Sequence, residues 1–311
     1  MKHLFIINPR AGKKSSTVRL MDQIELLRRT HGLTCETLLT GRAGDAEEMA
    51  RRTAQDGETV RIYACGGDGT LNEVINGAAG AAHIEVTSVP IGTGNDFIKN
   101  FGADGSRFLD LKQLWDGPVH DLDLIECNGR VALTIACVGL DARVAEDVHK
   151  YSRTLLLSGS GAYLASIGGN FFKKLSRRMI VSCDGRTTIG EYITVCVCNG
   201  RYYGGGFMPV AQARMDDGIL DVLIVQNVSH AMLLRLLPVC ARGEAWKYPE
   251  IARHVRVKSL QLQSRTPLTV SLDGEILHAR DLRIRISPWK IHFFAPVGAS
   301  CNATARSSPE Q

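Results

Sequence analysis

The chain has 311 residues, of which 44% are hydrophobic and 22% are charged. This composition is typical of a soluble globular protein, and it excludes a disordered chain or a collagen-like repeat. The formal net charge of +5 is mild. It is compatible with attraction to an anionic membrane or a nucleotide, and it does not indicate a nucleic-acid-binding protein.

Nine cysteines occur without a Cys-x-x-Cys pair. Such a scattered set points to a reducing cytoplasm rather than to a disulfide framework or a zinc site. Residues 1–7 are too short for the apolar part of a signal peptide. The longest uncharged stretch, residues 154–172, is interrupted by four glycines and three serines, unlike a membrane-spanning helix. We therefore expect a soluble, cytoplasmic protein.

The first 100 residues alternate between predicted strands and helices. Val18, Met21, Ile24 and Leu27 are expected to share one face of the first helix, which Gly32 should end. A second helix is expected to be capped by Asp45. The alternation predicts a doubly wound α/β domain with a parallel sheet, in which ligands bind at the carboxyl ends of the strands. The strands are expected at residues 4–7, 33–39, 59–64 and 85–89, and the helices at about 15–31, 45–56 and 71–79.

After about residue 122 the pattern changes to short alternating runs, many of them separated by turns such as Asp184-Gly185 and Asp273-Gly274. This pattern predicts an antiparallel β-sandwich. The strands are expected at residues 131–137, 179–183, 192–198, 220–225, 259–262, 268–272 and 282–286, with helical insertions near 161–175 and 231–239. We therefore predict two domains. Residues 1–122 form the nucleotide-binding domain, on which 288–311, with a strand at 291–295, packs back, and residues 123–287 form the β-rich domain.

Three glycine-bearing loops follow predicted strands of the first domain. They are Asn8-Pro9-Arg10-Ala11-Gly12, Gly66-Gly67-Asp68-Gly69-Thr70-Leu71-Asn72-Glu73 and Pro90-Ile91-Gly92-Thr93-Gly94-Asn95-Asp96. Glycines let the backbone turn sharply and approach a ligand, and the start of the helix that follows the second loop offers N–H donors to an anion. Three such loops at one sheet edge predict a nucleotide-sized site. The alternative is a set of tight turns without a ligand.

These three motifs, in this order, resemble the diacylglycerol kinase catalytic-domain family, and most closely its bacterial soluble lipid kinases. The second half carries similar segments, among them Tyr203 to Pro209 and the turn at Asp216-Asp217-Gly218. The resemblance implies ATP as phosphoryl donor. The positions that match ATP contacts are Asn8, Pro9, Arg10, Ala11, Gly12, Thr40, Gly66, Gly67, Asp68, Gly69, Thr70, Leu71, Asn72 and Thr93.

The resemblance also implies metal and catalytic residues. Asp68 matches a position linked to nucleotide-bound Mg²⁺, although this aspartate could instead cap the following helix. Asp217, with the backbone carbonyls of Arg214 and Ile219, matches a structural Mg²⁺ site; the alternative is a plain turn. Asp273 and Glu275 match the acidic loop proposed to supply the general base. From the residues alone, a plain β-hairpin turn at Asp273-Gly274 is the favoured interpretation, and only the resemblance favours catalysis.

A basic segment formed by Lys173, Lys174, Arg177 and Arg178 follows the aromatic pair Phe171-Phe172. It is interpreted either as a solvated helix face or as a patch that docks on anionic lipid.

The leading hypothesis is an ATP- and Mg²⁺-dependent lipid kinase. It would phosphorylate a hydroxyl of a diacylglycerol-like lipid, giving phosphatidic acid, or of a related lipid. The expected partner is lipid at a membrane surface, reached by peripheral association, with no nucleic acid; an exposed sheet edge would favour a homodimer. The alternatives are a soluble kinase similar to NAD kinases, which share the Gly-Gly-Asp-Gly-Thr loop, and a non-catalytic nucleotide-binding regulator.

Overall fold

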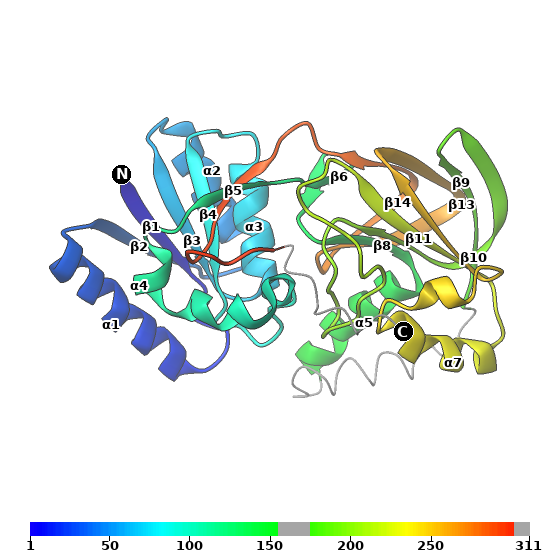
Figure 1. Cartoon of the computed structure of the whole chain (residues 1–311), viewed down its shortest axis with the longest axis horizontal. Helices are drawn as coiled ribbons and strands as arrows, with labels where there is room; N and C mark the ends of the chain where they lie inside the picture. Colours follow the sequence, from blue (N-terminus) through cyan, green and yellow to red (C-terminus); the bar gives the residue numbers. More distant parts are fainter. Residues whose placement is uncertain (155–174, 302–311) are drawn as a thin grey trace. The chain divides into compact units, whose positions relative to one another are not determined.

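A computed structural model of the chain describes residues 1–154 and 175–301. It divides into two compact units (Figure 1). The first unit contains Met1–Leu122 and the segment from Trp289 onward, and the second contains Asp123–Pro288. Among the described residues, no helix is long and apolar enough to cross a membrane.

The first unit is built on a six-stranded sheet in the order β2-β1-β3-β4-β15-β5. All of its neighbouring strands are parallel except β5, which runs antiparallel to β15. The central strands β1, β3 and β4 are mostly buried, as expected for a sheet covered on both faces. The strands are β1 (Lys2–Ile7), β2 (Thr34–Leu39), β3 (Val60–Cys65), β4 (Ile84–Val89), β5 (Val119–Leu122) and β15 (Ile291–Phe294).

The first three helices of this unit follow the predicted alternation, although the buried face of α1 differs, and η1 and α4 were not predicted. Leu20, Ile24 and Leu27 form its buried face, whereas Val18 and Met21 are 62% and 43% exposed. Ile24 and Leu27 are buried as predicted, but Leu20 takes the place of Val18 and Met21, because the spacing i, i+4, i+7 of the three buried residues matches the helical repeat better. The helices are α1 (Lys14–His31), α2 (Asp45–Gln55), α3 (Asp68–Ala78), the 3₁₀ segment η1 (Phe97–Leu109) and α4 (Leu111–Leu114).

Strand β15 joins the first unit through an aromatic core. Phe293 and Phe294 are fully buried. The Phe294 ring meets Tyr63 of β3 edge-on at 5.1 Å, and the Phe293 ring meets Phe97 at 5.0 Å. Edge-to-face aromatic pairs stabilise a core beyond the area that they bury. The strand that is most distant in sequence is therefore an internal part of this sheet.

The described part of the second unit contains nine strands, and all of their pairings are antiparallel. They follow the order β12-β11-β10-β8-β13-β14-β6-β7, and β9 pairs with both β10 and β13. Strands β9, β10, β8 and β13 thus form a closed ring around an apolar core. The strands are β6 (Ile125–Cys127), β7 (Arg130–Ala132), β8 (Ile135–Gly139), β9 (Arg177–Cys183), β10 (Arg186–Cys198), β11 (Leu220–Gln226), β12 (Ala252–Val257), β13 (Ser259–Leu272) and β14 (Glu275–Ile286).

A second apolar layer lies on the opposite face of β8, β10 and β11 and includes residues of α5 (Leu140–Thr154) and α7 (His230–Cys240). A short 3₁₀ segment, η2 (Ala245–Lys247), follows α7. The mixed α/β class, with a parallel first sheet and an antiparallel second unit, is as predicted. The helical insertion expected near residues 161–175 lies almost entirely outside the described residues.

Two strand predictions in the second unit were wrong in detail. The strand expected at residues 131–137 is interrupted between β7 and β8, because the N–H groups of Leu133, Thr134 and Ile135 donate to the Asp273 carboxylate. The strands expected at 259–262 and 268–272 are one strand, β13. Its pairing with β14 changes register between Gln263 and Leu268.

Candidate active site

The three predicted loops meet at one edge of the first sheet. Strands β1, β3 and β4 are neighbours, so the loops that follow them start side by side (Figure 1). The Asn8 N–H donates to the Cys65 carbonyl at 2.9 Å, and the Gly66 N–H donates to the Val89 carbonyl at 3.2 Å. The Gly92 N–H in turn donates to the Gly66 carbonyl at 3.0 Å. Backbone hydrogen bonds therefore fix the loops to one another.

Close backbone contact requires glycine at two positions in these loops. A Cβ on Gly12 would lie 1.9 Å from the Ile91 oxygen, and a Cβ on Gly92 would lie 2.6 Å from the Gly67 Cα. Gly67 itself is different, because a Cβ there would meet its nearest described heavy atom, the Gly92 Cα, at 3.8 Å. The loops are tightly packed but leave space beside Gly67.

That space lies at the start of α3. Gly67 is the N-cap residue and Asp68 begins the helix, so the first-turn N–H groups are directed toward this end. The amide nitrogen of Asn8 donates to Thr70 Oγ1 at 3.4 Å, which joins the first loop to the helix. The start of a helix beside an open, glycine-lined space suits a phosphate group. The first unit therefore fits the phosphates of ATP.

Asp68 does not cap its own helix. Its Oδ2 accepts the Asp96 N–H at 2.7 Å, and its Oδ1 accepts the Phe97 N–H at 3.2 Å. The carboxylate thus caps the start of η1 and joins the second loop to the third. The helix-cap alternative had the right kind of contact but the wrong helix.

The surroundings of Asp68 suit a cation. Burial raises the pKa of this carboxyl above its usual value, the Asp96 and Phe97 N–H groups lower it, and the nearby charge of Asp96 raises it. Two hydrogen bonds leave lone pairs on the carboxylate for a further ligand. A divalent cation would stabilise the ionised form, so Asp68 is the residue of this unit that best fits nucleotide-bound Mg²⁺.

Asn95 lies in the third predicted loop, although it was not among the positions matched to ATP contacts. Its backbone adopts the left-handed conformation, with φ of 49°. The side-chain nitrogen donates to the carbonyls of Gly92 (2.7 Å) and Pro90 (3.1 Å), which offsets the strain. Its Oδ1 is buried and accepts no hydrogen bond from the described residues. A residue with a left-handed backbone and an unused buried acceptor is a candidate binding position. The sequence Asn-Asp directly after Gly-Thr-Gly could have identified it.

The remaining predicted ATP residues fall into two groups. Leu71 and Asn72 are buried in α3, so their side chains pack inside the unit. The others are exposed or half-buried. Gly69 lies in the first turn of α3, and the rest lie in the loops: Pro9, Arg10, Ala11, Thr40 and Thr93. Thr40 extends the pairing of β2 with β1, since its N–H donates to the Ile7 carbonyl at 2.9 Å.

Glu73, the last residue of the second motif, has a structural position. Its carboxylate accepts the N–H groups of Gly44 (2.9 Å) and Ala46 (3.1 Å) at the start of α2. Asp45, which was predicted to cap α2, instead accepts the N–H groups of Gly41 and Arg42. Asp45 is the first residue of the helix rather than its N-cap, so its side chain closes the preceding loop. A residue of α3 therefore caps α2.

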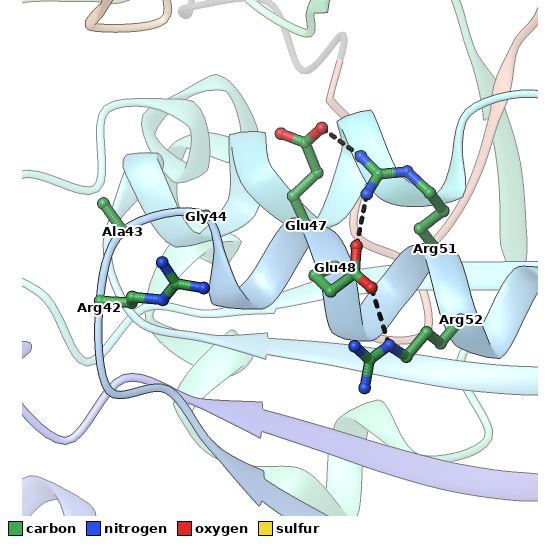
Figure 2. A pocket seen from close by; sticks show the side chains of 7 residues that line it. All are labelled: Arg42, Ala43, Gly44, Glu47, Glu48, Arg51 and Arg52. Carbon is green, nitrogen blue, oxygen red and sulfur yellow. Dashed lines mark hydrogen bonds and ion pairs between the residues drawn. The ribbon is translucent and has the colours of Figure 1, made fainter.

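A surface pocket of about 460 Å³ lies along α2 and the loop that precedes it (Figure 2). Arg51 bridges Glu47 (2.5 Å) and Glu48 (2.8 Å), and Glu48 also pairs with Arg52 (2.8 Å). These charges largely neutralise one another on an exposed face. We assign the pocket no part in phosphate binding.

The acidic loop of the second unit lies between β13 and β14. Asp273 has a left-handed backbone, with φ of 49°, and both of its carboxylate oxygens accept backbone N–H groups. Leu133 donates at 2.6 Å, Ile135 at 2.8 Å and Thr134 at 3.1 Å. Three such bonds hold the carboxylate in a fixed position. Asp273 is thus more than a residue of a plain hairpin turn.

Glu275, two residues later, is exposed at the start of β14, opposite Leu272. No hydrogen bond joins its carboxylate to another described residue. Glu275 is therefore available to an incoming group, whereas Asp273 is committed to the loop that it organises.

The predicted metal turn is held by ion pairs. Asp217 accepts the Ile219 N–H at 3.2 Å and forms a close ion pair with Arg256. The Arg214 side chain pairs with Asp216 at 3.2 Å. The Asp217 carboxylate already pairs with the Arg256 guanidinium, so a Mg²⁺ ion bound there would share this carboxylate with another cation.

Sequence analysis missed two buried residues beside this turn. Asp123 accepts the Gly218 N–H at 2.7 Å. Asn199 is fully buried, and its side-chain nitrogen donates to the carbonyls of Asp123 and Leu133, each at 2.7 Å. A polar residue directly after the apolar run of β10 was the signal for Asn199. The pair connects the turn at Asp217 with the segment that Asp273 holds.

An α/β unit with phosphate-type loops, followed by an antiparallel unit with an acidic loop, is the architecture of a two-domain phosphotransferase. Residues 2–127 match the family model described as the diacylglycerol kinase catalytic domain. Residues 134–295 match the model described as the YegS C-terminal NAD kinase beta sandwich-like domain.

Relatives with the same organisation span most of the chain. A Pseudomonas aeruginosa protein named "Probable lipid kinase YegS-like" is 30% identical over 262 residues and is covered over 84% of each chain. A protein of the same name from Shewanella frigidimarina is 26% identical, with 93% of each chain covered. A solved structure from Bacillus anthracis has a TM-score of 0.74 at 24% identity, covering 94% of this chain and 96% of that one. The chain belongs to the diacylglycerol kinase catalytic-domain family and groups with its bacterial lipid kinase branch.

Proposed function

We propose that the protein is an ATP-dependent lipid kinase that phosphorylates the hydroxyl of a diacylglycerol-like lipid. The observation that carries the proposal is the set of three interlocked loops around Gly67, with Asp68 fixed at their centre. Relatives that match most of the chain carry the name "Probable lipid kinase YegS-like", which favours a lipid acceptor over NAD.

In the proposed reaction, the lipid hydroxyl oxygen bonds to the γ-phosphorus of ATP while the bond to the leaving ADP oxygen breaks. The products are ADP and a phosphomonoester, which for diacylglycerol is phosphatidic acid. The loop amides and the first turn of α3 orient the phosphates, and Asp68 holds Mg²⁺, which neutralises developing charge when bound. Positioning contributes most of the rate, because the transition state is loose.

We further propose different roles for the two acidic residues of the second unit. Glu275 receives the proton of the lipid hydroxyl, since its carboxylate is exposed and unengaged by described residues. Asp273 positions the loop, because its oxygens are occupied by three backbone N–H groups. A carboxylate close to the hydroxyl need not have a strongly raised pKa when positioning dominates.

The test is a transfer assay with γ-labelled ATP and two acceptors, mixed micelles containing diacylglycerol and free NAD. We expect label in the lipid phase only, and loss of most turnover in Glu275→Gln with unchanged ATP affinity. Asp281→Asn, an exposed carboxylate further along β14, is the matched control and should keep full turnover. Label in NAD alone, or in neither acceptor, would refute the lipid kinase. Full turnover in Glu275→Gln would remove the base assignment only.

We also propose peripheral contact with anionic membranes through the basic segment near the start of β9. Arg177 and Arg178 are exposed residues of this strand, so the interpretation of these two as a helix face was wrong. Residues 171–174 lie outside the described part. Reversing the charge of Arg177 and Arg178 should weaken sedimentation with phosphatidylglycerol vesicles, and so should salt. The matched control reverses Arg19 and Arg29 on α1. Equal sedimentation of all three proteins would refute the contact.

A further inference from the structure

A cluster of sulfur and carboxylate ligands lies in the second unit, apart from the residues assigned to the kinase reaction. Cys137 of β8 and Cys196 of β10 are directly opposite each other in the antiparallel pairing of these strands. Their sulfur atoms are 3.7 Å apart. Asp141, in the first turn of α5, places its Oδ2 3.3 Å from the Cys196 sulfur. The two strands and the helix thus direct three potential ligands to one point.

The three ligand atoms all lie within 4.8 Å of one another. Tetrahedral Zn²⁺ with its usual bond lengths separates two sulfur ligands by about 3.8 Å, and a sulfur from an oxygen ligand by about 3.5 Å. The observed separations of 3.7 and 3.3 Å are close to both values. Two of the three separations are therefore close to those of a tetrahedral site, and the third lies within 4.8 Å.

A further group already supports the carboxylate. The Thr194 hydroxyl lies 2.9 Å from Asp141 Oδ2 and 3.2 Å from the Val138 carbonyl, which fixes this oxygen relative to β8 and β10. Such an outer partner orients a metal ligand. Cys137 and Cys196 are 1% and 2% exposed, within the apolar layer between the sheet and α5 and α7.

We propose that Cys137, Cys196 and Asp141 form a binding site for a thiophilic divalent cation of the Zn²⁺ class. On binding, two S–H bonds break and two metal–sulfur bonds form, the two protons leave to solvent, and Asp141 binds as carboxylate. The ion would join β8, β10 and α5. Sequence spacing gave no zinc motif because the two cysteines are 59 positions apart and meet only through strand pairing.

The experiment refolds the full-length protein under reducing conditions with Cd²⁺ as probe, since a buried site is loaded most readily during folding. We expect one tightly bound Cd²⁺ per chain, seen as thiolate-to-cadmium absorption in the ultraviolet and counted by elemental mass spectrometry. Cys137→Ser, Cys196→Ser and Asp141→Asn should each lower the affinity by at least about tenfold. Cys127→Ser, a buried cysteine of the other apolar layer, is the matched control and should bind as the wild type does.

Two results would overturn the proposal: no bound Cd²⁺ in the folded wild type, or equal affinity in the two ligand cysteine variants. If those variants fail to fold, ¹¹³Cd resonance of the wild-type complex decides. A shift in the range of two sulfur ligands supports the site, and an all-oxygen shift overturns it. These readouts do not depend on kinase activity.

Discussion

Replacing Gly67 with valine tests whether the space beside this residue holds the phosphates of ATP. The backbone of Gly67 is extended, with φ of −100° and ψ of −169°, which valine adopts without strain. A Cβ there meets Gly92 Cα at 3.8 Å and Asn95 Oδ1 at 3.9 Å, both ordinary contacts. Loss of glycine at the N-cap lowers stability slightly, whereas the lower entropy of the unfolded valine variant raises it slightly. We therefore expect the free energy of unfolding to change by no more than about 1 kcal/mol.

The effect on the ligand should be much larger. The branched side chain would fill the space at the start of α3, so we expect ATP affinity to fall by at least about 100-fold, or ~2.7 kcal/mol. Isothermal titration calorimetry with Mg-ATP measures the affinity, and urea unfolding measures the stability of the same samples. Ala103→Val, which adds volume at an exposed position of η1, should change neither.

Gly92 provides the contrast. A Cβ at Gly92 would lie 2.6 Å from Gly67 Cα and 2.7 Å from Gly67 N. Gly92→Ala should therefore lower stability by about 1–3 kcal/mol through overpacking, and its loss of ATP binding would be uninformative. Wild-type ATP affinity in folded Gly67→Val would refute the placement of the phosphates.

Three other residues give independent tests. Asp68→Ala should lower turnover in steady-state assays by at least about two orders of magnitude, because a charge-stabilising group is lost. A loss below about tenfold would mean that Asp68 only caps η1. Glu73→Ala should lower the free energy of unfolding by about 1–2 kcal/mol, because two N–H groups at the start of α2 lose their acceptor; unchanged urea unfolding would contradict this. Burial lowers the pKa of His3 from 6.5 to about 4, so the unfolded chain binds more protons between these values and stability is lost as the pH falls from 6.5 toward 4. The loss in the free energy of unfolding is at most ~3 kcal/mol and should be absent in His3→Gln. If the free energy of unfolding of both proteins fell equally with pH, His3 would not be the cause.

Local sequence patterns were sufficient for much of the first unit. The alternation of apolar runs with glycine-ended helices placed β1 to β4 and α1 to α3, and the loop motifs identified residues that the structure brings together, such as Asn8 and Thr70. These features depend on backbone periodicity and on turns, which neighbouring residues determine.

Features set by distant contacts could not be read in the same way. The strand expected at residues 131–137 is broken by Asp273, about 140 positions later in the chain. Asp68 caps η1 rather than α3 for the same kind of reason. Helix α5 was not predicted, although the buried residues Leu140 and Val144, one helical turn apart, were a usable signal.

The position of β15 constrains how the protein can fold during its synthesis. This strand lies between β4 and β5, and it carries two of the fully buried aromatic rings of the first unit. A nascent chain exposes β1 to β4 early, but their sheet stays incomplete until residues 291–294 have left the ribosome. The second unit is continuous in sequence, but its last strand, β14, ends at Ile286, only a few residues before β15. We infer that both units become complete at nearly the same late stage of synthesis, and that the β4 edge of the first sheet stays unpaired until then.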